Sequence, residues 1–151
     1  LTAFQLHPES RGSVHIRTQN PSDTPVIHAN YLQSEVDQKA VVTGLEMCRE
    51  LAAQEPFRQL IKREVRPSAS VTGSVSLLSY ARECGNTCWH PVGTCKMGQD
   101  SQSVVDAELG VHGILGLRVA DAAVLPNLVS SNTNMPAIMV GERCADFILG
   151  R

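Results

Sequence analysis

The segment from Trp89 to Gly98 concentrates residues that can do chemistry, in the order Trp-His-Pro-Val-Gly-Thr-Cys-Lys-Met-Gly. His90 precedes a proline, which biases its backbone toward an extended conformation, and it lies in a turn-rich stretch, where functional groups are often presented. Imidazole changes protonation near neutral pH, so His90 is the side chain best suited to accept a proton. The alternative is a structural histidine that hydrogen-bonds to a backbone carbonyl.

Two asparagines, Asn132 and Asn134, stand in the polar run Ser-Asn-Thr-Asn-Met-Pro that precedes the final apolar segment. Asparagine at such a place commonly forms a turn or caps the next helix, and Asn134 fits that role most easily. Asn132 can instead offer its amide to a substrate oxygen. Asp121 ends an apolar run, where a carboxylate suits a nucleotide site and a cap equally well.

Hydrophobic spacing predicts the elements that must position these side chains. We expect helices over 34–53, 76–84 and 136–149, one or two helical turns over 57–61, and strands over 13–18, 26–32, 63–66, 93–97, 103–106 and 117–120. Ser34 is the expected cap of the first helix, with Asp37 as a variant capping-box partner. Gly85 is the expected end of the second helix, and Pro136 suits the first position of the last.

These elements predict an α+β fold. A mostly antiparallel sheet over about 12–100 is expected to be flanked by the 34–53 and 76–84 helices, and the remaining chain to end in the 136–149 helix.

Composition excludes several function classes. The sequence has 151 residues, 42% hydrophobic and 19% charged, with a net charge of −2, which is ordinary for a globular protein. This charge gives no basic field for nucleic acid, and no apolar run approaches the roughly 20 residues needed to span a bilayer. The chain starts with neither a signal peptide nor Met, so we expect a cytoplasmic protein, or one peripheral to a membrane, that is a piece of a longer chain.

Five cysteines occur, and an odd number without framework spacing predicts free thiols in a reducing compartment. Cys48 and Cys144 fall inside helical patterns, where a thiol behaves as a small apolar group.

Five motifs follow one another: H-P-V-G-T-C-K-M-G from His90, V-V-D ending at Asp106, G-L-R-V-A-D-A from Gly116, N-T-N-M-P from Asn132 and G-E-R-C-A-D from Gly141. Their order resembles the C-terminal end of the glucose–methanol–choline (GMC) oxidoreductases. The turn at 8–12 and the stretch 25–32 also resemble that family's substrate domain, so the resemblance covers nearly the whole chain. It is closest to the choline-dehydrogenase-like branch.

The resemblance implies an FAD-dependent alcohol oxidoreductase that gives an aldehyde or ketone. His90 matches the histidine that takes the hydroxyl proton while a hydride passes to flavin N5, and Asn132 matches the residue that hydrogen-bonds the same oxygen. The chemistry suits these types, because an imidazole removes the proton and an amide stabilises the developing negative charge. The hydride step itself belongs to the cofactor.

The resemblance also implies cofactor contacts. Asp121 and Ala122 match positions near the ribityl–pyrophosphate linkage of the flavin. Asn134, Met135 and Pro136 match a turn close to the flavin ring.

In domain terms, the resemblance implies that residues 1–100 form the substrate-binding domain and that residues 101–151 return to the FAD-binding domain. The family binds the ADP half of FAD through a Gly-x-Gly-x-x-Gly strand–turn–helix, and this sequence has none: the glycines at 110, 113 and 116 have the wrong spacing. We therefore expect the partners to be a small alcohol and an N-terminal FAD-binding portion of the same protein. A homo-oligomer is left open.

Two other classes stay open. Cys84, Cys88, His90 and Cys95 are zinc-ligand types within a short stretch, although their spacing matches no familiar zinc module. The chain also fits a non-catalytic substrate-binding or assembly domain. Within the flavin family, a lyase without net redox change would use the same scaffold.

Overall fold

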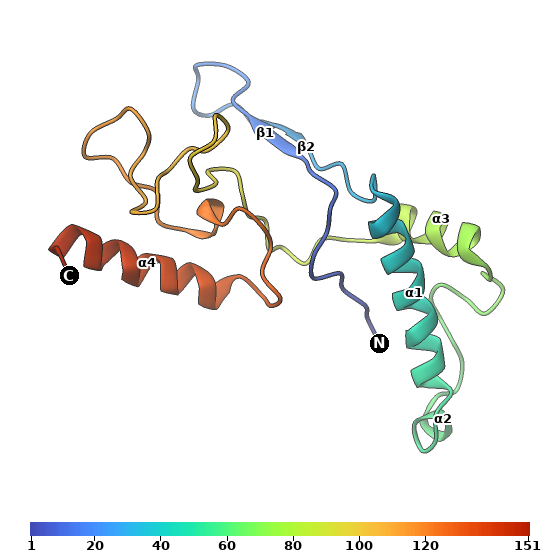
Figure 1. The fold of residues 1–151 in the computed structure, drawn as a ribbon. Helices are drawn as coiled ribbons and strands as arrows, with labels where there is room; N and C mark the ends of the chain where they lie inside the picture. Colours follow the sequence, from blue (N-terminus) through green and yellow to red (C-terminus); the bar gives the residue numbers. More distant parts are fainter. The chain divides into compact units, whose positions relative to one another are not determined.

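The computed structural model describes all residues, 1–151, and helices make up most of its regular structure (Figure 1). The elements in chain order are strands β1 (Ser13–His15) and β2 (Val26–His28), helices α1 (Glu35–Ala52), α2 (Phe57–Leu60) and α3 (Ser74–Cys84), the 3₁₀ turn η1 (Ala122–Val124) and helix α4 (Asn134–Leu149). The predicted helices are therefore confirmed, with ends within two residues of those expected.

Helix α1 begins where its cap predicts. Ser34 is extended, and its hydroxyl accepts a hydrogen bond from the backbone N–H of Val36 at 3.2 Å. The expected capping-box role of Asp37 is wrong, because this carboxylate is turned to a different set of donors. The helix ends at Ala52, four residues before Pro56, which cannot continue a helix.

The Asp37 carboxylate binds the N-terminal segment to α1. It is 1% exposed and accepts hydrogen bonds from the backbone N–H groups of Glu9 and Ser10, each at 2.8 Å, and from the Gln5 amide at 2.7 Å. Burial raises the pKa of this carboxyl, but the hydrogen bonds from Ser10, Glu9 and Gln5 together outweigh burial and lower the pKa to about 2. The ionised carboxylate is therefore part of the folded state.

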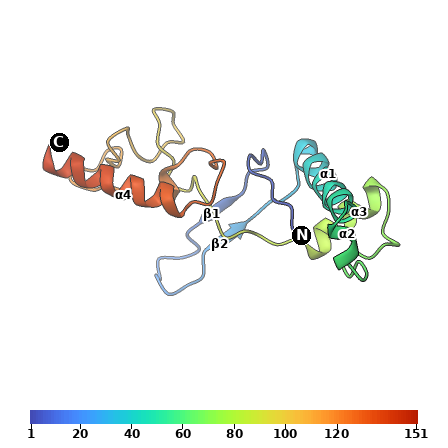
Figure 2. The same ribbon diagram turned by 90° about the horizontal axis from the view of Figure 1, so that it is seen from below.

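Helices α1 and α3 pack against each other and lie side by side in both views (Figures 1 and 2). Leu77 and Ala81 of α3 and Val42 of α1 are buried there. Gly85 ends α3 as predicted, but not through a left-handed backbone, since its φ is −65°. A Cβ at this position would lie 2.3 Å from the carbonyl oxygen of Ala81, so the helix end needs a residue without a side chain.

The predicted sheet over about 12–100, with its many antiparallel strands, is wrong. The structure has only the two-stranded antiparallel pair of β1 and β2. Three-residue strands are at the short limit for a stable sheet, and apolar side chains here stay exposed, with Ile16 after β1 at 89% and Ile27 within β2 at 62%. The alternation of residues predicted strands, but this chain supplies no layer against which their apolar side chains are buried.

The three strand-like pieces after residue 92 form isolated bridges instead of strands. Met97 pairs with Val105, Val105 with Val111, and Gly110 with Arg118. Glycines at 98, 113 and 116 have positive φ and interrupt the chain between these paired residues, so the alternating pattern does not extend into a ladder. The 63–66 segment also forms no strand.

The chain divides into two compact units. One comprises Leu1–Gly12 with Ile27–Cys88, and the other comprises Ser13–Val26 with Trp89–Arg151. The second unit has its own core of Val105, Leu109, Val124, Val140 and Cys144. The assignment of residues 1–100 and 101–151 to substrate-binding and flavin-completing roles stays a prediction.

None of the helices combines the length and the apolar character that crossing a membrane requires. All five cysteines are free thiols, and Cys144 is buried in the core of the second unit, as its helical position predicts.

Replacing Asp37 with Asn is expected to destabilise the fold, because the amide presents an NH₂ group to donors that need an acceptor. One pKa unit corresponds to about 1.4 kcal/mol, so the lowered pKa of Asp37 contributes about 2 kcal/mol to the free energy of unfolding. This contribution is complete above the ordinary pKa of 3.8 and is lost as the pH falls toward 2. Thermal unfolding of the complete protein at pH 7, 5 and 3 measures it.

Glu35→Gln is the matched control, because Glu35 lies on the same helix and its side chain is 84% exposed. Asp37→Asn should lower the melting temperature more at pH 7 than at pH 3, where about half of the carboxylate's contribution is already lost. Equal melting temperatures for both variants at pH 7 would contradict the role of the buried carboxylate.

Candidate active site

Two left-handed backbone positions frame the segment that carries His90. Trp89 has a φ of +63° and Gly93 has a φ of +87°. For a tryptophan this conformation is unusual and costs free energy, and such positions cluster at functional sites. The chain therefore turns sharply on both sides of His90, which is half-buried while Trp89 is 75% exposed.

Backbone pairing fixes this segment to the turn η1. The N–H of Cys95 donates to the carbonyl of Ala123 at 3.0 Å, and the N–H of Met97 donates to that of Val124 at 2.8 Å. Asp121 caps the same turn, because its Oδ1 accepts from the N–H of Ala123 at 2.6 Å. The cap role left open for Asp121 is thus confirmed.

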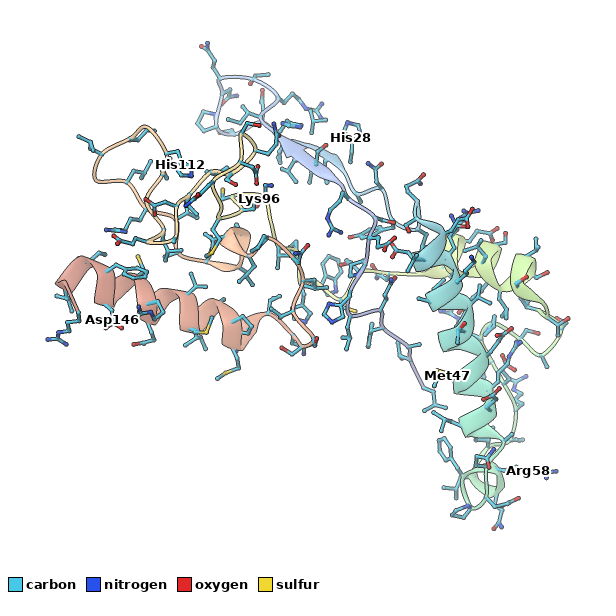
Figure 3. All side chains as sticks on the ribbon, in the orientation of Figure 1. His28, Met47, Arg58, Lys96, His112 and Asp146 are labelled. Atoms are coloured by element: carbon cyan, nitrogen blue, oxygen red, sulfur yellow. The ribbon has the colours of Figure 1, made fainter.

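The core of the second unit then places the start of α4. Val124 of η1 packs with Val140 and Cys144 of α4 and with Val105, and η1 contacts α4 directly. Lys96, on the His90 segment, and Asp146, on α4, mark these two elements in Figure 3. Because the helix is anchored along its apolar face, its first residues are positioned by the same contacts.

The loop after Met97 is closed by its own polar groups. Lys96 donates to Asp100 at 3.0 Å, and Asp100 also accepts from the N–H of Gln102 and the hydroxyl of Ser103. The Lys96 ammonium beside Asp100, with these two further donors, lowers the pKa of this exposed carboxyl. The loop is therefore a local support for the His90 segment.

His90 meets the residue that precedes α4. Its Nδ1 lies 2.9 Å from the hydroxyl oxygen of Thr133 and 3.4 Å from the backbone nitrogen of the same residue. The alternative role predicted for His90, a hydrogen bond to a backbone carbonyl, is therefore wrong. The other ring nitrogen, Nε2, makes no hydrogen bond.

The residue to which His90 is hydrogen-bonded lies between the two predicted asparagines in the sequence. Thr133 stands between Asn132 and Asn134; it is 7% exposed, whereas both asparagines are exposed. Asn134 is the first residue of α4 and not its cap, because the cap position belongs to Thr133. Two exposed amides therefore flank the residue to which the His90 ring is hydrogen-bonded.

The remaining predicted cofactor residues lie on the same two elements. Asp121 is exposed and Ala122 is half-buried, both at η1, while Met135 is 69% exposed and Pro136 is half-buried in the first turn of α4. The side chains of Asp121 and Met135 are therefore accessible to a bound molecule.

Thr133 was not predicted from the sequence. A threonine just before a helix is typical of an N-cap, and that pattern hides any other role. Only the structure reveals that its hydroxyl makes no capping bond and bonds to His90 instead.

The structure does not support a zinc site, since no group of three or more His, Cys, Asp or Glu side chains is placed to hold a metal ion. Cys84 and Cys88 are exposed free thiols.

Comparison with known proteins matches residues 8–141 to the GMC oxidoreductase family. The chain is 40% identical over 149 residues to an alcohol dehydrogenase [acceptor] of Pseudomonas putida. The aligned residues make up 99% of this chain and 27% of that protein. It is 40% identical over 152 residues to a choline oxidase of Arthrobacter globiformis, covering 98% of this chain and 28% of the relative.

Among solved structures, an FAD-dependent oxidoreductase from Chaetomium thermophilum superposes with a TM-score of 0.89 at 32% identity, over 96% of this chain and 25% of that one. The chain thus spans little more than a quarter of the length of these curated relatives. Because the family match covers most of the sequence, the chain belongs to the GMC oxidoreductases, of which it represents the C-terminal region.

Proposed function

We propose that this chain is the C-terminal, catalytic-residue-bearing part of an FAD-dependent enzyme that oxidises an alcohol to an aldehyde or ketone. Family membership and the relatives named for alcohol and choline oxidation support the proposal. The observation that carries it is the state of His90, whose Nδ1 is engaged by Thr133 while its Nε2 has no partner. A half-buried imidazole with one ring nitrogen held and the other open is suited to act as a base.

His90 accepts the proton of the substrate hydroxyl at Nε2. The short bond from Nδ1 to Thr133 holds the ring, and the turns at Trp89 and Gly93 hold the backbone. Removal of the proton gives the oxygen alkoxide character, which makes the adjacent C–H bond a hydride donor. The proton remains on the imidazole while the C–H bond breaks.

Asn132 donates its amide N–H to the same oxygen. Its side chain is exposed and it directly precedes Thr133, the residue that His90 contacts. An amide donor stabilises a developing oxyanion most effectively when it is already in place before the reaction. In this proposal His90 removes the proton and Asn132 holds the oxygen.

The cofactor-binding role of α4 fits the donors that its first turn offers. The helix begins without a side-chain cap, and the first N–H groups of a helix have no partners within it. Asn134 and Met135 therefore present N–H donors at the positive end of the helix, suited to the carbonyl oxygens of a flavin ring. The exposed Met135 side chain and Pro136 add apolar contact.

Asp121 fits hydroxyl groups better than phosphates. One of its oxygens caps η1, and a carboxylate accepts from hydroxyls but repels a pyrophosphate. We therefore assign Asp121, with Ala122 beside it, to the ribityl part of FAD. When bound, FAD supplies the two-electron acceptor that alcohol oxidation requires.

Changing His90 to Ala in the complete protein is expected to lower kcat/KM for alcohols by roughly 10²–10⁴-fold, because the base is removed. Choline, an aryl alcohol and short aliphatic alcohols are suitable probes, and bleaching of the flavin absorption band follows the reaction. His112→Ala is the control, since the side chain of this exposed histidine bonds only to the carbonyl of Gly98. Flavin content should stay unchanged in both variants.

An unchanged rate for His90→Ala would contradict the assignment of the base. If the wild-type protein binds flavin but no alcohol bleaches the flavin absorption band, the result would favour a role as a binding domain or a lyase.

Replacing Asn132 distinguishes hydrogen-bond donation from simple contact. Asn132→Asp keeps the size of the side chain but places a negative charge beside the alkoxide, so kcat should fall by roughly 10²–10³-fold or more. Asn132→His retains an N–H donor and is expected to keep more activity than Asn132→Asp. If the two variants have equal kcat, the proposed donor role fails.

A further inference from the structure

Thr133 occupies the N-cap of α4, yet its side chain makes no capping bond. Threonine at an N-cap usually stabilises a helix by accepting from a first-turn N–H, a bond worth typically about 1 kcal/mol. Here the hydroxyl lies 2.9 Å from Nδ1 of His90. The helix therefore has no side-chain cap, and the buried hydroxyl is hydrogen-bonded to the imidazole instead.

The partner at Nδ1 decides which ring nitrogen carries the proton. A neutral imidazole has one N–H and one lone pair. If the Thr133 hydroxyl accepts from Nδ1–H, the lone pair is on Nε2. If the ring instead accepts at Nδ1, Nε2 carries the proton and cannot receive another from an alcohol.

The two contacts with Thr133 differ in what they require of Nδ1. The backbone N–H of Thr133 points to Nδ1 from 3.4 Å and favours a lone pair there, whereas the hydroxyl at 2.9 Å can accept as well as donate. Hydrogen bonds with nitrogen donors are typically about 2.7–3.2 Å long, so the hydroxyl contact is the stronger one. The hydroxyl fits either tautomer, and it accommodates a proton on Nδ1, which is the tautomer that a base at Nε2 requires.

The charged state of the ring strengthens this choice. After His90 has taken a proton at Nε2, both ring nitrogens are N–H donors, and Nδ1–H needs an acceptor in a half-buried place. The Thr133 oxygen is such an acceptor and is 7% exposed, whereas a backbone N–H is not. Only the hydroxyl matches both the neutral and the protonated ring.

We propose that Thr133 is a positioning residue for His90: its hydroxyl accepts from Nδ1–H and so keeps Nε2 available as the base. This inference rests on the proposed function of His90. Thr133 itself does not touch the reacting atoms, and it acts by fixing the ring orientation and the tautomer.

The test compares Thr133→Val, which keeps the shape but removes the hydroxyl, with Thr133→Ser, which keeps the hydroxyl, both in the complete flavin-loaded protein. Thr133→Val should lower kcat/KM for the alcohol by roughly 10–100-fold, the range found when metal-bound histidines lose the partner that orients them. Thr133→Ser should stay within a few-fold of wild type. Flavin content and melting temperature show whether each variant is folded.

Nitrogen-15 NMR of histidine-labelled protein gives a readout independent of activity. Wild type and Thr133→Ser should show the neutral His90 ring protonated at Nδ1, and Thr133→Val should shift the proton toward Nε2. A wild-type ring protonated at Nε2 would overturn the proposal without any variant. Equal rates and spectra for wild type and Thr133→Val would do the same.

The roles of His90 and Thr133 can be tested independently of each other. If His90→Ala loses activity but Thr133→Val does not, the base assignment stands and only the role of Thr133 is wrong. If His90→Ala keeps full activity, the proposed function itself is wrong.

Discussion

The hydrogen bond between His90 and Thr133 is the interaction on which the site depends, since it joins two segments that are far apart in sequence. Its 2.9 Å distance is maintained by supports on both sides. The His90 segment pairs through Cys95 and Met97 with the turn η1, and η1 packs against α4 through Val124. The core therefore sets where the first residues of α4 lie, and those residues in turn set how the imidazole is held.

Local signals explain why the helices and the histidine motif are predictable from the sequence. Ser34 marks the start of α1 as a cap, and the end of α3 requires glycine at position 85, because a Cβ there would meet the carbonyl oxygen of Ala81. His90 and Asn132 stand out through motif order, which does not depend on three-dimensional contacts. The sheet was overestimated because residue alternation reports a tendency to be extended, whereas a sheet also needs partners to cover side chains such as Ile16.

Long-range polar contacts are what the sequence cannot reveal. The buried Asp37 has the pattern of a capping residue, but it binds the backbone of Glu9 and Ser10, which are distant in sequence. Thr133 likewise has the pattern of a cap and bonds to His90 instead. In both cases tertiary structure gives a polar side chain a better partner than its local one, and a local pattern carries no information about that choice.

In the proposed reaction, the imidazole of His90 and the carboxamide of Asn132 act on one substrate oxygen. A crystal structure of the complete protein with a bound, unreactive alcohol analogue tests it most directly. We expect Nε2 of His90 and Nδ2 of Asn132 both to lie within hydrogen-bonding distance of the analogue's oxygen, about 2.7–3.2 Å. An oxygen contacted by neither side chain, or by only one of them while the other points away, would contradict it.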